Sequence, residues 1–318
     1  FAEEILELAR ADERIVAVTA AMQQPVGLQP MADALPDRVI DVGIAEQHAL
    51  TASAGMAFAG LHPVVALYAT FLNRAFDQVL MDIGLHHAGV TIVLDRAGLT
   101  GTDGASHNGM WDMALLSHVP GLRLAAPRDE TTLREDLRTA AATSDGPTVL
   151  RYPKGALPER APALRVMGPP NDPFEAVDVL MEADDDGPGE RRLLLVAVGA
   201  MTPAVLAAGR DLADEGRAVA VVAPRWVVPI PRALVETARS FDGVVVVEDG
   251  LVDGGIGSQL RDALEDNAAE TGRRCPVVAR VGVPRRFLGT ASRKQLLADF
   301  GMDTEGIAAT ARRLLSAV

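Results

Sequence analysis

Short apolar runs of strand-forming residues alternate with helical stretches along nearly the whole sequence. In the first half these runs are RIVAVTA, RVIDV, PVVALY, VTIVLDR, LRLAAP and TVLRYP. Such runs are too short for typical helices, and most are followed by a longer amphipathic or Ala-rich segment. The alternation predicts parallel sheets with helices on both faces, which is an α/β fold.

The alternation stops between about Lys154 and Arg191, where proline, glycine and acidic residues dominate. It resumes with the runs RLLLVAVG, AVAVVAP, GVVVVED and PVVARVGVP. We therefore predict two doubly wound, mainly parallel-sheet domains, over residues 1–160 and 191–318, joined by a linker over 161–190 that can carry a short strand. A chain of 318 residues accommodates two domains of ordinary size.

The composition excludes several classes of protein. The formal net charge is −13, and a surface this acidic disfavours binding to nucleic acid or to an anionic membrane. A single cysteine, Cys275, excludes a framework of internal disulfides. The acidic N-terminal stretch FAEEILELARADERI is unlike a secretory signal, and the most apolar run is interrupted by Gly199 and Pro203. We expect a cytoplasmic protein with neither nucleic acid nor membrane as partner.

Two helices are predicted with some internal detail. In FLNRAFDQVLMDIGLHH, an apolar stripe contains Phe71, Ala75, Val79 and Ile83. In RDETTLREDL, Asp129 is the expected N-cap, with acidic residues in the first turn.

Polar side chains follow the carboxyl ends of several predicted strands. Glu46 comes shortly after RVIDV, Tyr68 ends PVVALY, Arg96 ends VTIVLDR, and Arg151 lies in TVLRYP. In open parallel sheets, ligands bind beyond the carboxyl ends of the strands. The sequence therefore predicts that these side chains meet at one edge of the first sheet.

A long glycine-rich loop, AGLTGTDGASHNGMWD, follows Arg96 and carries Asp103 and His107. Glycines give such a loop backbone freedom and permit close approach to a ligand, and loops at this edge usually carry function. The alternative is a flexible surface loop in which Asp103 and His107 only cap local turns.

The arginines and aromatics also leave alternatives open. Arg96 and Arg151 suit a phosphate or carboxylate, because a guanidinium can bond two oxygens at once. They could equally pair with Asp95 or with acids of the linker. Tyr68 and Phe71 could be ordinary packing residues, although only 4% of the chain is aromatic.

Several motifs resemble one enzyme family. DVGIAEQHA, ALYATFLNRAFDQVLMD, DRAGLTGTDGASHNG and GPTVLRYPKG resemble the pyrimidine-binding domain of the 1-deoxy-D-xylulose-5-phosphate synthases, which are thiamine-diphosphate enzymes of the transketolase superfamily. PRWVVPIP, VVVVEDG and GGIGSQL resemble the C-terminal domain of the same family. The resemblance covers practically the whole chain and implies the family's transketolase-like fold.

The resemblance implies a catalytic and cofactor-binding set. Glu46 would hydrogen-bond the N1′ nitrogen of the thiamine diphosphate aminopyrimidine, so that acid–base catalysis runs through the cofactor. Phe71 would stack on the pyrimidine, and Arg74 would support the side of the pocket that Phe71 forms. His107 would lie beside pyruvate or its adduct.

The resemblance also implies the reaction and its substrate contacts. Tyr68, Arg96 and Arg151 would hold the phosphate of D-glyceraldehyde 3-phosphate, and Asp103 would position this acceptor. The family condenses pyruvate with that aldehyde, with loss of CO2, to 1-deoxy-D-xylulose 5-phosphate. This is the first step of non-mevalonate isoprenoid biosynthesis, and its product also feeds thiamine biosynthesis.

One departure concerns the remaining part of the family's cofactor site. The family binds the diphosphate and Mg²⁺ through another domain, which carries G-D-G and a downstream Asn, and no such unit is present here. We predict no metal ligands in this chain, which is then a fragment, a partly described protein or one subunit of a split enzyme. Alone it would turn over nothing, and with its partner it would form a homodimer.

Other functions remain open at this point. The domain order and length also suit the second subunit of a split transketolase or of a 2-oxoacid dehydrogenase. A non-catalytic α/β partner subunit is the alternative outside enzymes.

Overall fold

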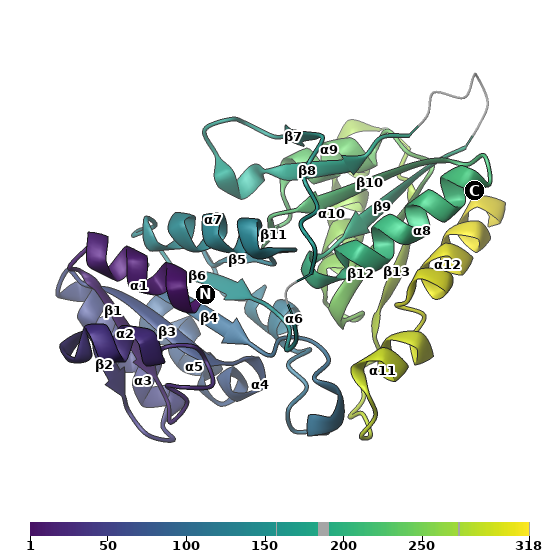
Figure 1. Ribbon diagram of the computed structural model, residues 1–318. Helices are drawn as coiled ribbons and strands as arrows, with labels where there is room; N and C mark the ends of the chain where they lie inside the picture. The colour runs from purple at the N-terminus through teal and green to yellow at the C-terminus, as the bar shows by residue number, and fades with distance from the viewer. Residues whose placement is uncertain (157, 184–190, 273, 318) are drawn as a thin grey trace.

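The computed structural model describes residues 1–156, 158–183, 191–272 and 274–317 and shows two α/β lobes (Figure 1). The elements of the first lobe are α1 (Ala2–Ala11), β1 (Ile15–Thr19), α2 (Gln29–Ala34), η1 (Pro36–Arg38), β2 (Val39–Asp41), α3 (Glu46–Phe58), β3 (His62–Tyr68), α4 (Ala69–Leu72), η2 (Asn73–Ala75), α5 (Phe76–Gln78), η3 (Val79–Gly84), β4 (Thr91–Asp95), η4 (Gly101–Asp103), α6 (Asp112–Leu116), β5 (Arg123–Ala125), α7 (Glu130–Ala141) and β6 (Thr148–Arg151).

The second lobe follows in the chain. Its elements are β7 (Arg165–Met167), η5 (Pro173–Glu175), β8 (Val177–Met181), β9 (Arg192–Ala197), η6 (Gly199–Met201), α8 (Thr202–Asp214), β10 (Ala218–Pro224), β11 (Trp226–Val228), α9 (Arg232–Ala238), β12 (Gly243–Leu251), α10 (Ile256–Thr271), β13 (Val277–Val283), α11 (Arg293–Asp299) and α12 (Thr304–Ala317).

Both sheets are mainly parallel, as the sequence predicts. Within the described residues, the first sheet has the strand order β11-β5-β6-β4-β3-β1-β2, and only β11 runs antiparallel to its neighbour. The second has the order β13-β12-β9-β10-β8-β7, with β8 and β7 antiparallel. Helices lie on both faces of each sheet (Figure 1). The predicted α/β class and the doubly wound, mainly parallel sheets are confirmed.

The strands form where apolar runs can be buried on both faces. Every residue of β1 is buried, and so is every residue of β10 and of β12. Such continuous apolar runs are typical of parallel strands covered by helices on both sides. The predicted N-cap at Asp129 is also confirmed, because its side chain accepts a hydrogen bond from the Thr132 backbone in a capping box.

The second sheet begins inside the segment 161–190, where the sequence favoured a linker. β8 pairs with β10, and β7 pairs with β8 at the outer edge of that sheet. These strands are short and are separated by a Pro-rich turn, so their pairing depends on β10 rather than on their own sequence. Residues 184–190 lie outside the described part of the chain.

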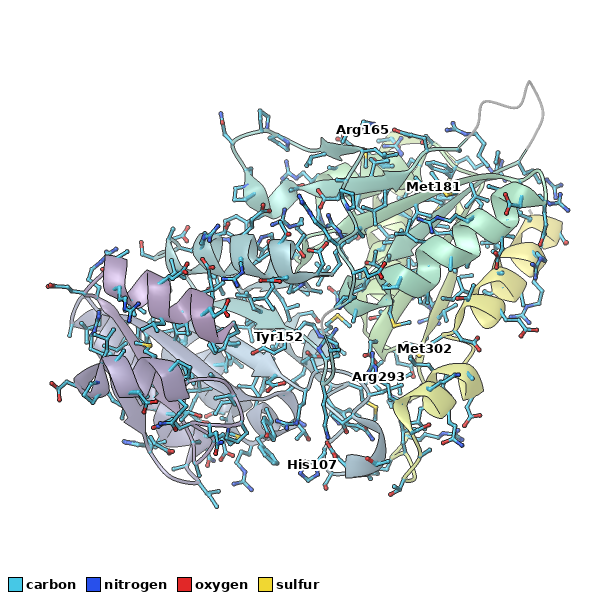
Figure 2. All side chains as sticks on the ribbon, viewed as in Figure 1. His107, Tyr152, Arg165, Met181, Arg293 and Met302 are labelled. Carbon is cyan, nitrogen blue, oxygen red and sulfur yellow. The ribbon has the colours of Figure 1, made fainter. Side chains whose placement is uncertain are left out.

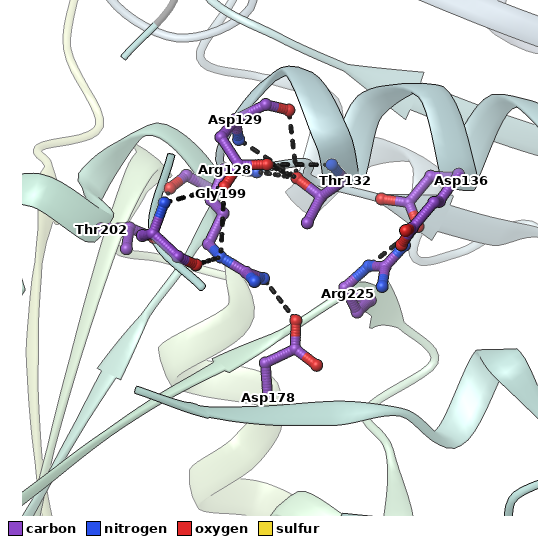
Figure 3. Close-up of polar contacts among 10 residues, drawn as sticks. Arg128, Asp129, Thr132, Asp136, Asp178, Gly199, Thr202 and Arg225 are labelled. Atoms are coloured by element: carbon purple, nitrogen blue, oxygen red, sulfur yellow. Dashed lines mark hydrogen bonds and ion pairs between the residues drawn. The ribbon is translucent and has the colours of Figure 1, made fainter. Parts of the chain in front are cut away.

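The two lobes are joined by ion pairs and by a strand of the second lobe that pairs with the first sheet. β11, which follows β10 of the second lobe, pairs with β5 of the first sheet, and its Trp226 is 1% exposed. Arg128 pairs with Asp178 of β8, and Arg225 pairs with Asp136 of α7 (Figure 3). A strand shared in this way fixes the second lobe against the edge of the first sheet.

Candidate active site

Glu46 is the first residue of α3 and lies just beyond the end of β2. Asp41 is the last residue of β2. Its carboxylate accepts hydrogen bonds from the Ala21 and Gly43 backbones, which fixes the turn into the helix. The Glu46 side chain is 3% exposed, and Arg74 Nη1 donates to its Oε2 over 3.3 Å. A buried carboxyl at a helix N-terminus can therefore share a proton or accept a further hydrogen bond.

An aromatic wall, formed by Tyr68, Phe71 and His107, lies beyond the end of β3. Tyr68 ends this strand and stacks on Phe71 of α4, with ring centroids 5.6 Å apart and planes 16° apart. The imidazole of His107 contacts Phe71 edge-on, with centroids 5.8 Å apart. The strand end and the glycine-rich loop therefore meet at Phe71.

Phe71 is the exception in the predicted apolar stripe. Ala75, Val79 and Ile83 are fully buried, whereas Phe71 is only partly buried. The predicted single helix is also divided into short α, 3-10 and π segments between Ala69 and Gly84. Phe71 packs against the core without being enclosed by it, and it also contacts His107.

Arg96 follows β4 and lies against the same wall. Its guanidinium carbon is 3.8 Å from the centroid of the Tyr68 ring, and Nη1 is 3.6 Å from Asp95 Oδ2. Its φ of +58° is unusual for a residue with a side chain and costs about 1 kcal/mol or more. Burial, opposed by the nearby Arg96, raises the pKa of Asp95. Arg96 also lines a cavity of about 370 Å³ that includes Tyr152 and Lys154.

The glycine-rich loop brings two polar groups to this region. Lys154 Nζ donates to both carboxylate oxygens of Asp103 over 2.8 Å, and this hydrogen bonding lowers the pKa of Asp103. His107 Nδ1 is 3.0 Å from Ser106 Oγ, and the Thr70 hydroxyl donates to the Ser106 carbonyl. Figure 2 shows His107 and Tyr152 in the region where the two lobes meet.

Arg151 does not join this group. It is 3% exposed, its Nε donates to Asp112 Oδ2 over 2.6 Å, and its Nη2 donates to the Asp249 backbone carbonyl over 2.8 Å. Burial raises the pKa of Asp112 even against the attraction of Arg151. The structure thus brings five of the predicted residues together, namely Tyr68, Phe71, Arg96, Asp103 and His107. It pairs Glu46 with Arg74, and it places Arg151 in the joint between the lobes.

Three residues near the site were missed by the sequence analysis. Lys154 lies only three residues beyond the end of β6 at Arg151, so the strand-end rule that selected Arg151 could also have found it. Asp249 and Arg293 of the second lobe contact the base of the glycine-rich loop. No local signal indicates that contact, because it depends on how the lobes pack.

The described residues contain no group of three or more His, Cys, Asp or Glu side chains able to hold a metal ion. None of their helices combines the length and the apolar character needed to cross a membrane.

Comparison with known families identifies both lobes. Residues 1–160 match the family model described as "Transketolase, pyrimidine binding domain", and residues 183–307 match "Transketolase, C-terminal domain". The chain belongs to the transketolase family, and the family resemblance predicted from its sequence is confirmed.

Individual relatives narrow this assignment. The chain is 51% identical over 308 residues to a 1-deoxy-D-xylulose-5-phosphate synthase of Leifsonia xyli subsp. xyli, covering 97% of this chain and 45% of the relative. It is 52% identical over 311 residues to a 1-deoxy-D-xylulose-5-phosphate synthase of Kocuria rhizophila, again covering 97% and 45%. The chain therefore spans about half the length of the curated relatives it matches.

A solved structure has nearly the same extent. A protein titled "Split gene transketolase, inactive beta4 tetramer" superimposes with a TM-score of 0.79 at 29% sequence identity. The match covers 99% of this chain and 96% of that one. A chain of this length and domain order therefore exists as a separate subunit in that protein.

Proposed function

We propose that this chain supplies the pyrimidine-binding and C-terminal domains of a 1-deoxy-D-xylulose-5-phosphate synthase. The enzyme would decarboxylate pyruvate and join the remaining two carbons to D-glyceraldehyde 3-phosphate, as the first step of non-mevalonate isoprenoid biosynthesis. The names of relatives at about half identity support this reaction. The observation that carries it is the cluster of Phe71, His107, Arg96 and Asp103 around Tyr68, together with the buried Glu46 that Arg74 contacts.

The residues present fit the aminopyrimidine end of thiamine diphosphate. Glu46 is a buried carboxyl with a single hydrogen bond, from Arg74, among the described residues, so acceptor capacity remains. Phe71 offers an aromatic surface that is not fully buried. When bound, thiamine diphosphate supplies a carbon nucleophile that also accepts the electrons released by decarboxylation.

The roles of this chain's own residues follow from that fit. Glu46 would hold a proton at Oε1 or Oε2 and share it with the pyrimidine ring nitrogen. Arg74 would keep that carboxyl in place, and Phe71 would shield it from water. His107, which contacts Phe71, would donate a hydrogen bond to the carboxylate or carbonyl oxygen of pyruvate.

The phosphate of the acceptor would be bound by Arg96 and Lys154. Both line the cavity of about 370 Å³, and Tyr68 orients the guanidinium of Arg96. Asp103 holds Lys154 and would also accept a hydrogen bond from an acceptor hydroxyl. Arg151, for which the family resemblance implied phosphate binding, has its guanidinium engaged by Asp112 and Asp249 and is left out of this proposal.

The rest of the enzyme would complete the site. The diphosphate and Mg²⁺ would be bound by the half of the protein that this chain does not include, whether that half is fused or a separate subunit. The assembled enzyme would be a cytoplasmic homodimer.

The test is a Glu46→Gln variant, assayed with a diphosphate-binding half fused or supplied separately. Because Gln cannot exchange a proton, turnover of pyruvate and aldehyde should fall roughly 10²–10⁴-fold, while the unfolding midpoint stays close to wild type. Glu305→Gln is the matched control, since Glu305 also lies in the first turn of a helix, α12, but is exposed. Undiminished turnover by Glu46→Gln would refute the proposal.

A split transketolase subunit is the second candidate, favoured by the full-length match to the split-gene protein. The two functions differ in the donor, which is a 2-oxo acid for the synthase and a ketose phosphate for a transketolase. Supplying each donor with the same aldehyde acceptor separates them. Turnover of the ketose alone would replace the synthase assignment, and NAD-dependent oxidation of pyruvate would indicate a 2-oxoacid dehydrogenase.

A further inference from the structure

The glycine-rich loop, residues 97–109, is closed by backbone hydrogen bonds at its base and carries two of the predicted site residues at its tip. Gly98 and Gly109 exchange two backbone hydrogen bonds, of 3.0 and 2.8 Å, so the loop leaves and returns at one point. The tip carries Asp103 and His107, which contact Lys154 and Phe71 of the first lobe. Whatever holds the base therefore sets the position of both tip residues.

Both lobes hold the base: the Ala97 N–H donates to the Tyr152 carbonyl of the first lobe, and residue 99 is held by the second lobe. The Leu99 N–H donates to Asp249 Oδ1 over 3.0 Å, and the Leu99 carbonyl accepts from Arg293 Nη1 over 2.5 Å. Arg293 Nη2 in turn pairs with Asp249 Oδ2 over 2.5 Å. Both polar groups of residue 99 are thus held by one acid–base pair that belongs to β12 and α11. Figure 2 shows Arg293 close to the loop that carries His107.

The fit between loop and pair is tight. A Cβ at Gly98, whose φ is +73°, would overlap the Asp249 carboxylate. A Cβ at Gly101, whose φ is +78°, would lie 2.8 Å from the Arg293 backbone nitrogen. The Leu99 side chain is fully buried in the core of the second lobe. Glycine is therefore required at both positions for the loop to reach this lobe.

The loop is also braced internally. Asn108, which is 1% exposed, accepts from the Thr100 backbone over 2.9 Å and donates to the Gly104 carbonyl. This brace transmits the position of the base to the tip, because it links residues on both sides of Asp103. The first lobe contributes side-chain contacts at the tip, but the described base contacts of residue 99 come from the second lobe.

From this arrangement we infer that Asp249 and Arg293 are positioning residues: the C-terminal domain sets the placement of Asp103 and His107 for the reaction. The inference uses the proposed function only for its kinetic readout. Neither residue reaches the aromatic wall itself, so the effect passes through the loop. A displacement of about 1 Å at reacting groups can cost on the order of a hundredfold in rate.

The experiment compares Arg293→Met with Arg293→Lys in the complete enzyme. The side chain of Arg293 is 24% exposed at the start of α11, so its replacement by Met leaves no buried cavity. It does remove the partner of the buried Asp249 carboxylate, and Arg293→Lys keeps a cation there. Hydrogen exchange of the amides in 97–109 should rise at least about tenfold in Arg293→Met, with α3 unchanged. The kcat should fall about tenfold to a hundredfold with little change in the KM for pyruvate.

Arg293→Lys should recover part of both effects. An ammonium can pair with Asp249, but it lacks the planar fork that reaches the Leu99 carbonyl at the same time. Arg312→Ala is the control, because it removes an exposed arginine that pairs with Glu215 in the same lobe, away from the loop.

Each outcome decides the inference. Unchanged exchange of the loop in Arg293→Met would overturn it, whatever the kinetics. Raised exchange with unchanged kcat would also overturn it, because the loop would then be held without being positioned for the reaction. If the unmodified enzyme lacks synthase activity but the loop still loosens, the proposed function fails while the structural contact stands.

Discussion

Arg96 and Arg151 lie at the ends of neighbouring strands of the first sheet, β4 and β6, and their surroundings are opposite. Arg151 is 3% exposed and is engaged by Asp112 and by the Asp249 carbonyl. Arg96 is 20% exposed, lies over an aromatic ring and lines a cavity. The second lobe covers the end of β6 and leaves the end of β4 open.

The comparison separates two uses of a strand-end arginine. A guanidinium whose donors are taken by buried protein acceptors contributes to the joint between lobes and has little left for a ligand. A guanidinium that keeps unpaired donors beside a cavity can bind an anion. Arg96 Nη1 is buried and lacks a hydrogen-bond partner among the described residues, and we therefore propose that Arg96 belongs to the second group.

The largest expected effect is on Arg151. Arg151→Met should lower the free energy of unfolding by about 3–5 kcal/mol, because it leaves the Asp112 carboxylate buried without its partner. Urea unfolding at pH 7 measures this. The double variant Arg151→Met/Asp112→Leu should recover much of the loss, since it removes both charges. Equal stability of Arg151→Met and wild type would erase the contrast with Arg96.

The next largest expected effect is a pH dependence of the free energy of unfolding, which we attribute to Glu248 in the joint between the lobes. Its side chain is 1% exposed and accepts hydrogen bonds from the backbones of Ile256 and Gly257 at the start of α10. Burial raises the pKa of Glu248 from 4.5 to about 7. Between these values the folded protein keeps a proton that the unfolded chain has lost, so stability falls as the pH rises.

Glu248→Gln should flatten that slope. In the wild-type protein, Glu248 should lower the free energy of unfolding by about 3 kcal/mol at most between pH 5 and pH 8. Asp136, whose pKa burial also raises to about 7, keeps part of the slope in the variant. Unfolding by urea at several pH values measures both slopes. A variant slope as steep as that of wild type would contradict the assignment to Glu248.

Much of the fold was accessible from the sequence. The ten apolar runs correspond to β1, β2, β3, β4, β5, β6, β9, β10, β12 and β13, because parallel strands buried on both faces are continuous apolar segments. The strand β11 was missed, and the linker that was expected to carry a short strand contains two, β7 and β8. These three strands are short, and their pairing is set by a neighbouring strand, for β11 in the sheet of the other lobe.

The location of the site could be predicted in outline from the sequence. Strand ends predicted where Glu46, Tyr68 and Arg96 would lie, because parallel strands bring their carboxyl ends to one edge. The same rule could not separate Arg96 from Arg151, since the difference comes from β12 and α6 packing over the end of β6.

The smallest expected effect is on Arg96, and it should appear in binding rather than in stability. Arg96→Met removes the charge beside the cavity while it keeps the length of the side chain against Tyr68. In the complete enzyme, the KM for the phosphorylated aldehyde should rise about tenfold to a hundredfold, equivalent to about 1.4–2.8 kcal/mol, with a smaller change in kcat. Its free energy of unfolding should stay within about 1 kcal/mol of wild type, because the Arg96–Asp95 contact of 3.6 Å is long. The non-phosphorylated aldehyde is the control, since its KM should not respond to the loss of an anion-binding group. A variant that is as destabilised as Arg151→Met but binds the phosphorylated aldehyde normally would show that both arginines serve the joint.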